Sequence, residues 1–501
     1  MHRKDIKRSI QKQLKKKYPD WKRMTKKEKK EMASQVMQEA VEEHDFDHPP
    51  TASIEQLTGI EGQMPTKNII PVDKMGKFIE NYNSGFLFKP NGVKKTPSEI
   101  TDPELRYVDQ LIDNGIINCL LANKGYSPQM RDIFPYQLFR MELLKVLKYP
   151  EISYRKYCTE EYFGMDRKQN RRFVGLPLNT KEIIDHTELC HFRGNMSFTQ
   201  STNILVYFLH HFYSSGCLEY QVLHAIDSTE LPMEFNYPIC TIEVKGKKIR
   251  IYSDIDCDCG KRRNKRNLSQ YFIGYRMHTL TVINPSTGHS FPLVSLISAG
   301  NHHDKLFVKP LLKLAKAMGI NVELLTADEA YHDGDGSIYK ETGTHVIAPP
   351  SKKVKLPDNV LEFPLQVTCN QYCETPMVNL GCSDQGHEYR CDSQLGECIH
   401  ESCCPKSRIV PFDSGFFQPI VASSPMAEKA IEIRKNCERP FNLMKKREGL
   451  EQTRVRSQQG VVVRSTITTI ATLLIEMMGT RKKQKKKEKK DNQMDLFKKT
   501  G

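Results

Sequence analysis

The stretch Val222-Leu223-His224-Ala225-Ile226-Asp227 has the pattern of a short β-strand that ends in a carboxylate. A second strand is predicted over 322–327 and ends at Asp328. Between the two, the pattern predicts a hairpin over 239–251, strands over 271–283 and 291–298, and a helix over 304–318 that is capped by Asn301 or Asp304 and ends at Gly319. This alternation of strands and helix predicts an α/β core.

The two aspartates stand where a metal site in such a core is expected. Open α/β sheets place ligands at the carboxyl ends of their strands, so Asp227 and Asp328 can converge across adjacent strands. Carboxylate oxygens are the ligands that Mg²⁺ prefers, and two such ions can stabilise both oxygens of an in-line phosphoryl displacement. Either aspartate alone is equally typical of a turn or a helix cap.

A long helical stretch over 426–446 supplies a third carboxylate. At 100° per residue Arg434, Glu438 and Lys445 share one face, so a metal ligand is flanked by two cations suited to phosphates. The alternative is an ordinary solvated pair between Arg434 and Glu438. Pro440 is expected to kink the helix just past Glu438.

The chain resembles the DDE-class transposases of insertion sequences, in the branch with a Tyr-x2-Arg-x3-Glu-x6-Lys signature. It has Ile431-x2-Arg434-x3-Glu438-x6-Lys445, with isoleucine in place of the tyrosine. Asp328-x2-Tyr331 is similar to a second motif of that branch, and Asn301-His302-His303-Asp304 is similar to the segment that leads into it. The resemblance covers roughly residues 130–480.

The resemblance implies an RNase H-like catalytic core with a triad of Asp227, Asp328 and Glu438, which bind two Mg²⁺ ions or Mn²⁺. It also implies a mainly helical N-terminal region and an insertion before the glutamate helix. The expected organisation is a basic helical extension and linker (1–75), a helical DNA-binding domain (76–218), the first part of the core (219–348), a Cys-rich insertion (349–425), the C-terminal core helices (426–480) and a basic disordered tail (481–501).

The Cys-rich insertion is a candidate zinc site. Clustered thiols in an intracellular protein more often bind metal than form disulfides, and tetrahedral zinc takes four nitrogen or sulfur ligands. The spacing is irregular, so reduced thiols without metal are the alternative. The candidate ligands are Cys369, Cys373, Cys382, Cys391, Cys398 and Cys403, with His387 and His400 among them. Asp254, Asp256 and Asp258 form a separate acidic run that is interpreted as a loop feature, and His303 is interpreted as a capping residue.

Net charge is concentrated at the two ends of the chain. Residues 1–30 hold 14 Lys/Arg and 3 Asp/Glu, and residues 481–490 hold 8 and 1, within a total of +15. Such runs attract DNA phosphates or merely improve solubility. The further phosphate contacts predicted are Arg434, Lys445, Tyr331, Lys446, Arg447, Arg262 and Arg263.

The function predicted is a metal-dependent transposase that nicks DNA at the ends of an insertion sequence and joins the freed 3′-hydroxyl to target DNA. Its partners are double-stranded DNA, as terminal inverted repeats and target, and a second copy of the chain as a homodimer. The alternatives are an inactive transposase-derived DNA-binding protein and a regulatory zinc protein. No apolar run is long enough for a membrane span, and Val461 to Gly479 is interrupted by Arg464 and Glu476. A cytoplasmic, nucleoid-associated location is therefore expected.

Overall fold

The computed structural model describes most of the chain between residues 53 and 499. The described residues are 25, 53–65, 67–85, 100–122, 133–218, 222–234, 238, 240–244, 247–254, 256–263, 269–349, 360–362, 365–368, 377–383, 385–391, 407–411, 425–447, 449–450 and 455–499. The helix predicted within 1–45 and the β-run predicted at 415–422 lie outside them.

The N-terminal region is helical, as predicted. Its helices are α3 (Ile54–Thr58), α4 (Val72–Asn83), α5 (Pro103–Gln110), α6 (Asn114–Leu121), α7 (Pro135–Lys148), α8 (Tyr154–Tyr157), α9 (Glu160–Phe163), α10 (Lys168–Val174), α11 (His186–Asn195) and α12 (Phe198–Tyr213). The single helix expected from Pro103 to Ala122 is two helices, because the Asp113 side chain accepts from the backbone N–H groups of Gly115 and Ile116 and starts α6.

A mixed sheet forms the centre of the molecule. Its strands are β1 (Leu223–Pro232), β4 (Asp258–Arg263), β5 (Ser269–Ile283), β6 (Ser290–Ala299), β7 (Leu324–Thr326) and β8 (His345–Ile347). The second half of β5 pairs antiparallel with β1 and β6, and its first half pairs with β4. On the other side of β1, strands β7 and β8 follow in parallel. The order across the sheet is therefore β6–β5–β1–β7–β8.

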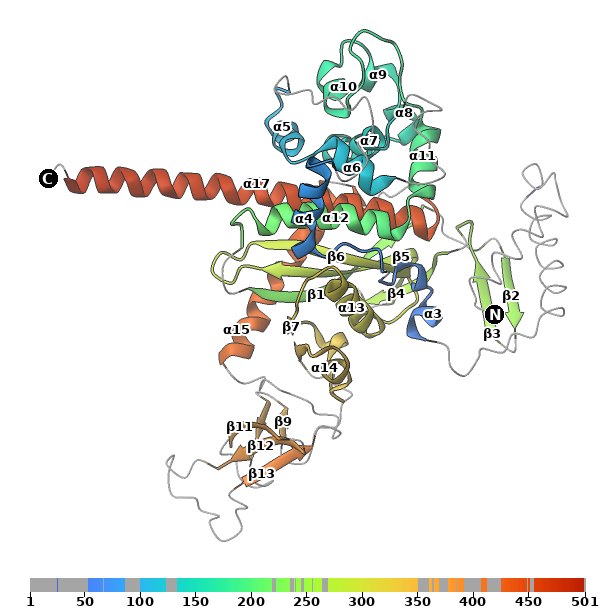
Figure 1. Ribbon diagram of the computed structural model, residues 1–501. Helices are drawn as coiled ribbons and strands as arrows, with labels where there is room; N and C mark the ends of the chain where they lie inside the picture. Colours follow the sequence, from blue (N-terminus) through green and yellow to red (C-terminus); the bar gives the residue numbers. More distant parts are fainter. Residues whose placement is uncertain are drawn as a thin grey trace.

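Helices cover the sheet on both sides (Figure 1). On one side α12 and the long α17 (Gln458–Lys499) lie between the sheet and the helical domain. On the other, α15 (Pro425–Arg434) packs its Ala427 and Ala430 against Leu223 and Ile347. The crossover from β6 to β7 contains the 3₁₀-helix η4 (Asp304–Phe307) and α13 (Val308–Ala317). After β7 come the 3₁₀-turn η5 (Glu329–Tyr331) and α14 (Ser337–Thr342).

The long α17 is a buried core helix over its first half. Its stretch Gln458–Thr480 is long and apolar enough to cross a membrane but is 89% buried inside the protein. Its threonines satisfy their hydroxyls on the carbonyls four residues earlier, as Thr468 does on Arg464 and Thr472 on Thr468. The basic segment expected to be disordered instead continues this helix to Lys499. Lys, Arg, Gln and Glu are good helix formers, and propagation from a formed helix needs no new nucleus.

Two insertions carry small sheets of their own. The predicted hairpin is present as β2 (Cys240–Val244) and β3 (Lys247–Ile251). The Cys-rich insertion contains β9 (Val360–Glu362), β10 (Leu365–Val367), β11 (Val378–Ser383), β12 (Gly386–Arg390) and β13 (Ser407–Pro411). The last three form an antiparallel sheet that the sequence pattern did not predict. In Figure 1 these strands lie below the main sheet, beyond α14 and α15.

Candidate functional site

Strand register places Asp227 and Asp328 side by side. In the parallel pair of β1 and β7, Ala225 lies opposite Thr326. Each aspartate comes two residues after its member of that pair, so the two carboxylates stand at the same level and on the same face of neighbouring strands. The structure thus brings together the two residues that the strand ends in the sequence predicted to converge.

The Asp227 carboxylate is buried beneath the α15 side of the sheet. Its Oδ1 accepts a hydrogen bond from Ser228 N at 2.8 Å, and the Cys437 thiol donates to its Oδ2 at 3.6 Å. Burial raises the pKa of Asp227 to about 6, and the charge of Asp328 adds to the rise, while the Ser228 N–H, Arg434 and Cys437 oppose it. A carboxylate in this state gains from a nearby cation.

Asp328 lies at the start of the turn that follows β7. It is the N-cap of η5, where its Oδ1 accepts from Ala330 N at 2.9 Å. Burial raises its pKa, and the charges of Asp304 and Glu329 act in the same direction, while the Ala330 N–H and Arg434 lower it. Arg434 therefore acts electrostatically on both aspartates, and it is the cation of the site.

The helix that carries Glu438 is not continuous. After α15 the chain forms a 3₁₀-turn, η7 (Lys435–Cys437), and then α16 (Glu438–Lys446). The break therefore comes before Glu438, not after Pro440 as expected. Because α16 starts at Glu438, Pro440 falls in a first helical turn, where a missing N–H removes no helical hydrogen bond.

This break changes which residue faces the aspartates. Cys437 is buried against Ala225 and Ile283 and touches Asp227, whereas Glu438 is exposed. Among the interactions of the described residues, none joins Glu438 to Asp227 or Asp328. Lys445 is half-buried on the last turn of α16. The helical wheel missed this arrangement because it assumed a uniform 100° per residue.

The other predicted phosphate contacts fall in different surroundings. Tyr331 is fully buried, so its hydroxyl cannot meet a phosphate at the surface. Arg447 pairs with Glu104 of α5 at 2.6 Å, which ties α16 to the helical domain. Lys446 is exposed. Arg262 and Arg263 lie in β4, and only their backbone is described.

The acidic run Asp254, Asp256 and Asp258 has a structural role, in agreement with its interpretation as a loop feature. Asp254 Oδ2 accepts from Ser457 N at 2.9 Å, and Asp256 Oδ2 accepts from Gln458 N at 3.0 Å. Carboxylates are favourable at a helix N-terminus, so this loop anchors the start of α17. His303 caps η4, where its Nδ1 accepts from Lys305 N, also as predicted.

Metal ligation is only partly open to inspection. Within the part of the chain that the structure describes, no three His, Cys, Asp or Glu side chains are arranged to hold a metal ion. Of the zinc candidates, Cys369, Cys373, Cys398 and Cys403 lie outside the described residues, and Cys382 has only its backbone described, opposite the buried His387 in the β11–β12 pair. Cys391 is half-buried, and its thiol forms no disulfide. Zinc in the insertion stays a prediction.

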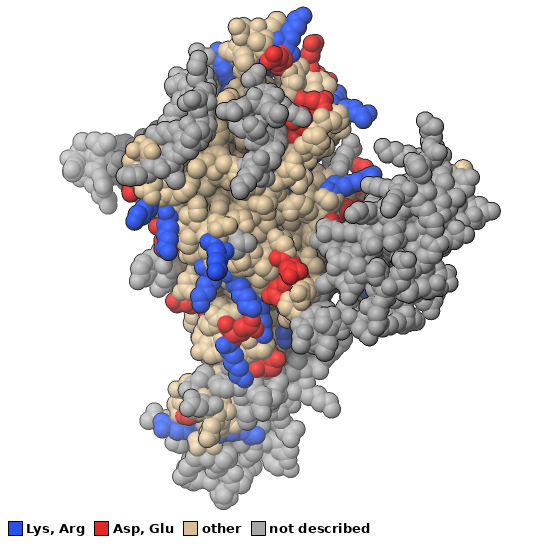
Figure 2. All heavy atoms as spheres, turned by 45° about the vertical axis from the view of Figure 1, so that its right-hand side comes forward, with Lys and Arg blue, Asp and Glu red and all other residues tan. Residues whose placement is uncertain are grey.

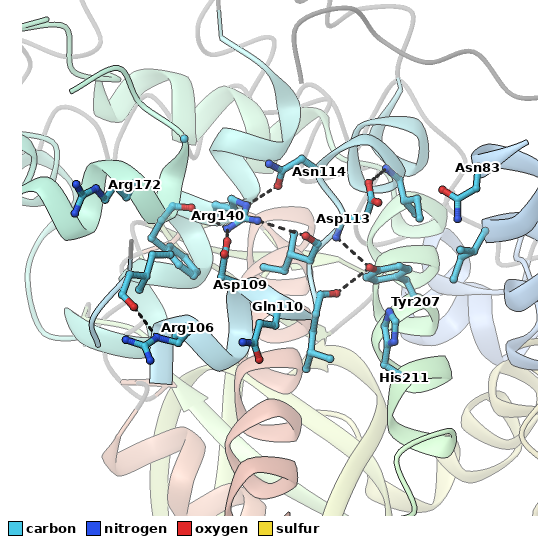
Figure 3. Close-up of a pocket in the computed structure, with 17 residues that line it drawn as sticks. Asn83, Arg106, Asp109, Gln110, Asp113, Asn114, Arg140, Arg172, Tyr207 and His211 are labelled. Atoms are coloured by element: carbon cyan, nitrogen blue, oxygen red, sulfur yellow. Dashed lines mark hydrogen bonds and ion pairs between the residues drawn. The ribbon is translucent and has the colours of Figure 1, made fainter. Parts of the chain in front are cut away.

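A cavity of about 650 Å³ lies within the helical domain, apart from the two aspartates (Figure 3). Its central charged group, Arg140, is paired with Asp109 at 2.6 Å and donates to Asn114 Oδ1 at 2.7 Å. The Tyr207 hydroxyl donates to the carbonyl of Leu111 and accepts from Asp113 N. These polar groups satisfy one another across α5, α6, α7 and α12, so they hold the helical domain together.

The described surface carries charges of both signs. On the face shown in Figure 2, Lys and Arg side chains lie among Asp and Glu side chains. Lys309 and Lys313 of α13 both pair with Glu341 of α14, at 2.8 and 2.6 Å. Attraction for DNA phosphates is therefore expected mainly from the basic segments near the chain ends.

Sequence reasoning missed two members of the site region. Cys437 is adjacent to the glutamate that the signature singles out, and the preceding apolar residues, Ile431 and Ile433, were the signal for a buried face. Arg276 on β5 pairs with Asp304 through both carboxylate oxygens, at 3.0 and 3.1 Å. No model of a protein family matches this sequence, and a search of curated proteins finds no match either.

Proposed function

We propose that this protein is a DDE-type transposase that cleaves DNA at the ends of an insertion sequence and transfers the cut strand to target DNA. The observation that carries the proposal is the pair Asp227 and Asp328, held side by side after neighbouring parallel strands and close to Arg434. A carboxylate pair with a neighbouring cation is suited to phosphodiester chemistry, which needs bound metal and phosphate but no protein nucleophile.

The order of the strands supports an RNase H-like core for this function. Three consecutive strands of the main sheet, β1, β5 and β6, are antiparallel neighbours, and β7 and β8 then add in parallel on the far side of β1. Such a core is expected to carry its first acidic residue on the central strand and its second after the adjacent parallel strand. Asp227 and Asp328 occupy these places.

The donor atoms of the pair fit a hard divalent cation. Both aspartates offer only oxygen, and burial together with neighbouring negative charge raises the pKa of each. Asp227 and Asp328 would hold Mg²⁺ or Mn²⁺, with Glu438 as the third carboxylate. When bound, the cation would polarise the scissile phosphate and lower the pKa of an attacking water.

The chain's own residues then have distinct roles. Arg434 holds a phosphate oxygen beside the carboxylates, and Lys445 contacts the DNA backbone one helix further along. In cleavage, water attacks phosphorus and the 3′-oxygen leaves as the hydroxyl. In strand transfer, that hydroxyl attacks a target phosphate and displaces the target's 3′-oxygen, so both steps are single substitutions at phosphorus. The helical domain and the two basic segments bind the DNA ends, and two copies of the chain hold the two ends of the element.

A second candidate function is favoured by one observation. Cys437, and not Glu438, faces Asp227. If DNA binding does not bring Glu438 to the pair, the protein binds DNA without cutting it and is a transposase-derived DNA-binding protein.

The deciding experiment uses duplexes made from the DNA that flanks the reading frame. We expect Mg²⁺-dependent nicks that leave 3′-hydroxyls at one boundary on each side, followed by joining to a supercoiled plasmid. Tight binding without nicks, in either Mg²⁺ or Mn²⁺, would favour the inactive DNA-binding protein. The absence of both binding and cleavage would show that the proposal is wrong.

Arg434→Gln is expected to slow the chemistry without changing the dependence on Mg²⁺. The substitution removes a preorganised positive charge next to the reacting phosphate, which commonly lowers the rate by about 10²-fold. Single-turnover cleavage of pre-bound DNA measures this rate. Lys435→Gln is the matched control, since Lys435 is the adjacent exposed cation and we expect its loss to have little effect. Equal rates in wild type and the Arg434 variant would remove Arg434 from the site.

Replacing the eight Lys/Arg of residues 481–490 by Gln is expected to weaken DNA binding and flatten its dependence on salt. Each phosphate neutralised by the protein adds about 0.9 to the slope of log K against log salt for duplex DNA. Glutamine keeps a high helix propensity, so the change tests charge and not helix formation. Binding isotherms between low and moderate salt measure the slope. An unchanged slope would show that the segment makes no phosphate contacts.

A further inference from the structure

A buried tyrosine stands behind the two aspartates. Tyr331 is the last residue of η5, is 0% exposed, and its hydroxyl has no hydrogen-bond partner among the described residues. Its backbone N–H donates to the carbonyl of Asp328 at 3.1 Å, so the two residues share one tight turn. Burial of a hydroxyl without a partner is unfavourable, and a retained example therefore calls for an explanation.

Carboxylates surround this hydroxyl. Burial raises the pKa of Tyr331 well above its ordinary value, and the charges of Asp304, Asp227 and Asp328 add to that rise, while the nearby Ser228 side chain opposes it. The three aspartates act on the phenol as negative charges, so the surroundings of the hydroxyl are rich in acceptors and disfavour the phenolate. A phenol that stays protonated among carboxylates is available to donate a hydrogen bond.

One of the three carboxylates is already committed. Asp304 at the start of η4 accepts from Arg276 through both oxygens, at 3.0 and 3.1 Å, and both side chains are largely buried. Under η4, the ring of His278 stacks on Phe307 with 3.9 Å between centroids, and its Nε2 lies 3.0 Å from Ser298 Oγ. The Arg276–Asp304 pair is thus fixed to strands β5 and β6, and η4 in turn packs on η5.

We propose that Tyr331, supported by the Arg276–Asp304 pair, is a positioning residue for the carboxylate site. This inference rests on the proposed function: when Asp227 and Asp328 hold a divalent cation, the Tyr331 hydroxyl donates to Asp227 and fixes the orientation of that carboxylate. Outer partners of this kind orient metal-binding carboxylates and set metal affinity. Tyr331 therefore acts through Asp227 and does not touch DNA, which replaces its predicted role as a phosphate contact.

The test compares Tyr331→Phe with wild type in the absence of DNA, with Mn²⁺ as the probe. The thermal midpoint of the full chain is followed during a Mn²⁺ titration, which gives an apparent Kd. We expect the variant to bind Mn²⁺ about 10-fold more weakly or worse, the range seen for outer partners of metal ligands. Without metal its midpoint should not fall, because the hydroxyl that it loses has no partner there among the described residues. A purely structural role would lower the metal-free midpoint instead.

Two further variants make the result specific. Tyr157→Phe is the matched control, because Tyr157 is equally buried but donates to the Met141 carbonyl in the helical domain. We expect its metal-free midpoint to fall and its Mn²⁺ affinity to stay that of wild type. Arg276→Lys keeps the charge but loses the double contact to Asp304, and it should weaken Mn²⁺ binding as Tyr331→Phe does.

The outcomes separate the two proposals. Equal Mn²⁺ affinity in wild type and Tyr331→Phe would overturn the positioning role alone and leave the transposase proposal in place. Failure of the wild-type chain to respond to Mn²⁺ or Mg²⁺ would overturn the proposed metal site and this inference with it. Cleavage by Tyr331→Phe that recovers at high Mg²⁺ would support the inference, since a positioning residue affects metal affinity more than the chemical step.

Discussion

Asp227→Asn is expected to abolish DNA cleavage and strand transfer while DNA binding persists. The substitution keeps the shape of the side chain but removes the charge that would hold a divalent cation. Because bound metal supplies several kcal/mol of transition-state stabilisation, we expect a loss of at least ~10³-fold in single-turnover rate. Gel-shift binding to the same duplex shows whether the DNA interface is intact. Asp328→Asn should behave in the same way, since the two side chains stand at the same level of adjacent strands.

The same variant is expected to be more stable than wild type in EDTA at pH 7 to 8. Burial raises the pKa of Asp227 from 3.8 to about 6, so between these pH values the folded state binds more protons than the unfolded state. Wild-type stability therefore falls as pH rises through that window, by on the order of 1–3 kcal/mol at most, whereas the neutral amide of the variant does not titrate.

The pH dependence also supplies the control for this prediction. At pH 4 the wild type and Asp227→Asn should unfold at similar temperatures, and only the wild type should gain stability when Mg²⁺ is added at pH 7.5. Near wild-type cleavage by the variant would show that Asp227 is not a metal ligand. A variant less stable than wild type at pH 7.5 would show that the carboxylate has a structural role.

Much of the core could be predicted from the sequence because local patterns there agree with the final packing. The runs that end in Asp227 and Asp328 are apolar on both faces, as strands buried between helices require. The turn between β5 and β6 is marked by Asn284, Pro285 and Gly288, and Gly288 has the positive φ of 65° that such a turn needs. The register that aligns the two aspartates follows from these strands alone.

The prediction was poorest where tertiary contacts override local geometry. The helix with Arg434 and Glu438 contains a 3₁₀-turn that seats Cys437 against Ala225, and a helical wheel cannot represent it. Arg439 is then held by Glu476 of α17 through two contacts of 3.0 Å, which fixes α16 from the far side. Glu476 was interpreted only as an interruption of an apolar run, although its burial is what anchors α16.

The helical domain contains the contact whose loss is expected to destabilise the protein most. Glu142 of α7 is 0% exposed and pairs with Arg193 of α11, which is 4% exposed. The Tyr154 hydroxyl also donates to Glu142, at 2.7 Å, and the Arg193 guanidinium lies 4.0 Å from the centre of the Tyr154 ring. Each charge in this cluster is compensated by its buried neighbours.

Arg193→Ala would leave the Glu142 carboxylate buried without this counter-charge. Breaking one side of a buried ion pair typically costs about 3–5 kcal/mol, and for a chain of this size we expect a midpoint roughly 6–20 °C lower. The double variant Glu142→Leu/Arg193→Leu should be closer to wild type, because hydrophobic replacement leaves no unpaired charge. Thermal unfolding of the three proteins at pH 7.5 decides the matter. If Arg193→Ala shifted the midpoint by no more than the double variant does, water would have to reach Glu142, and the pair would not be the electrostatic centre of the helical domain.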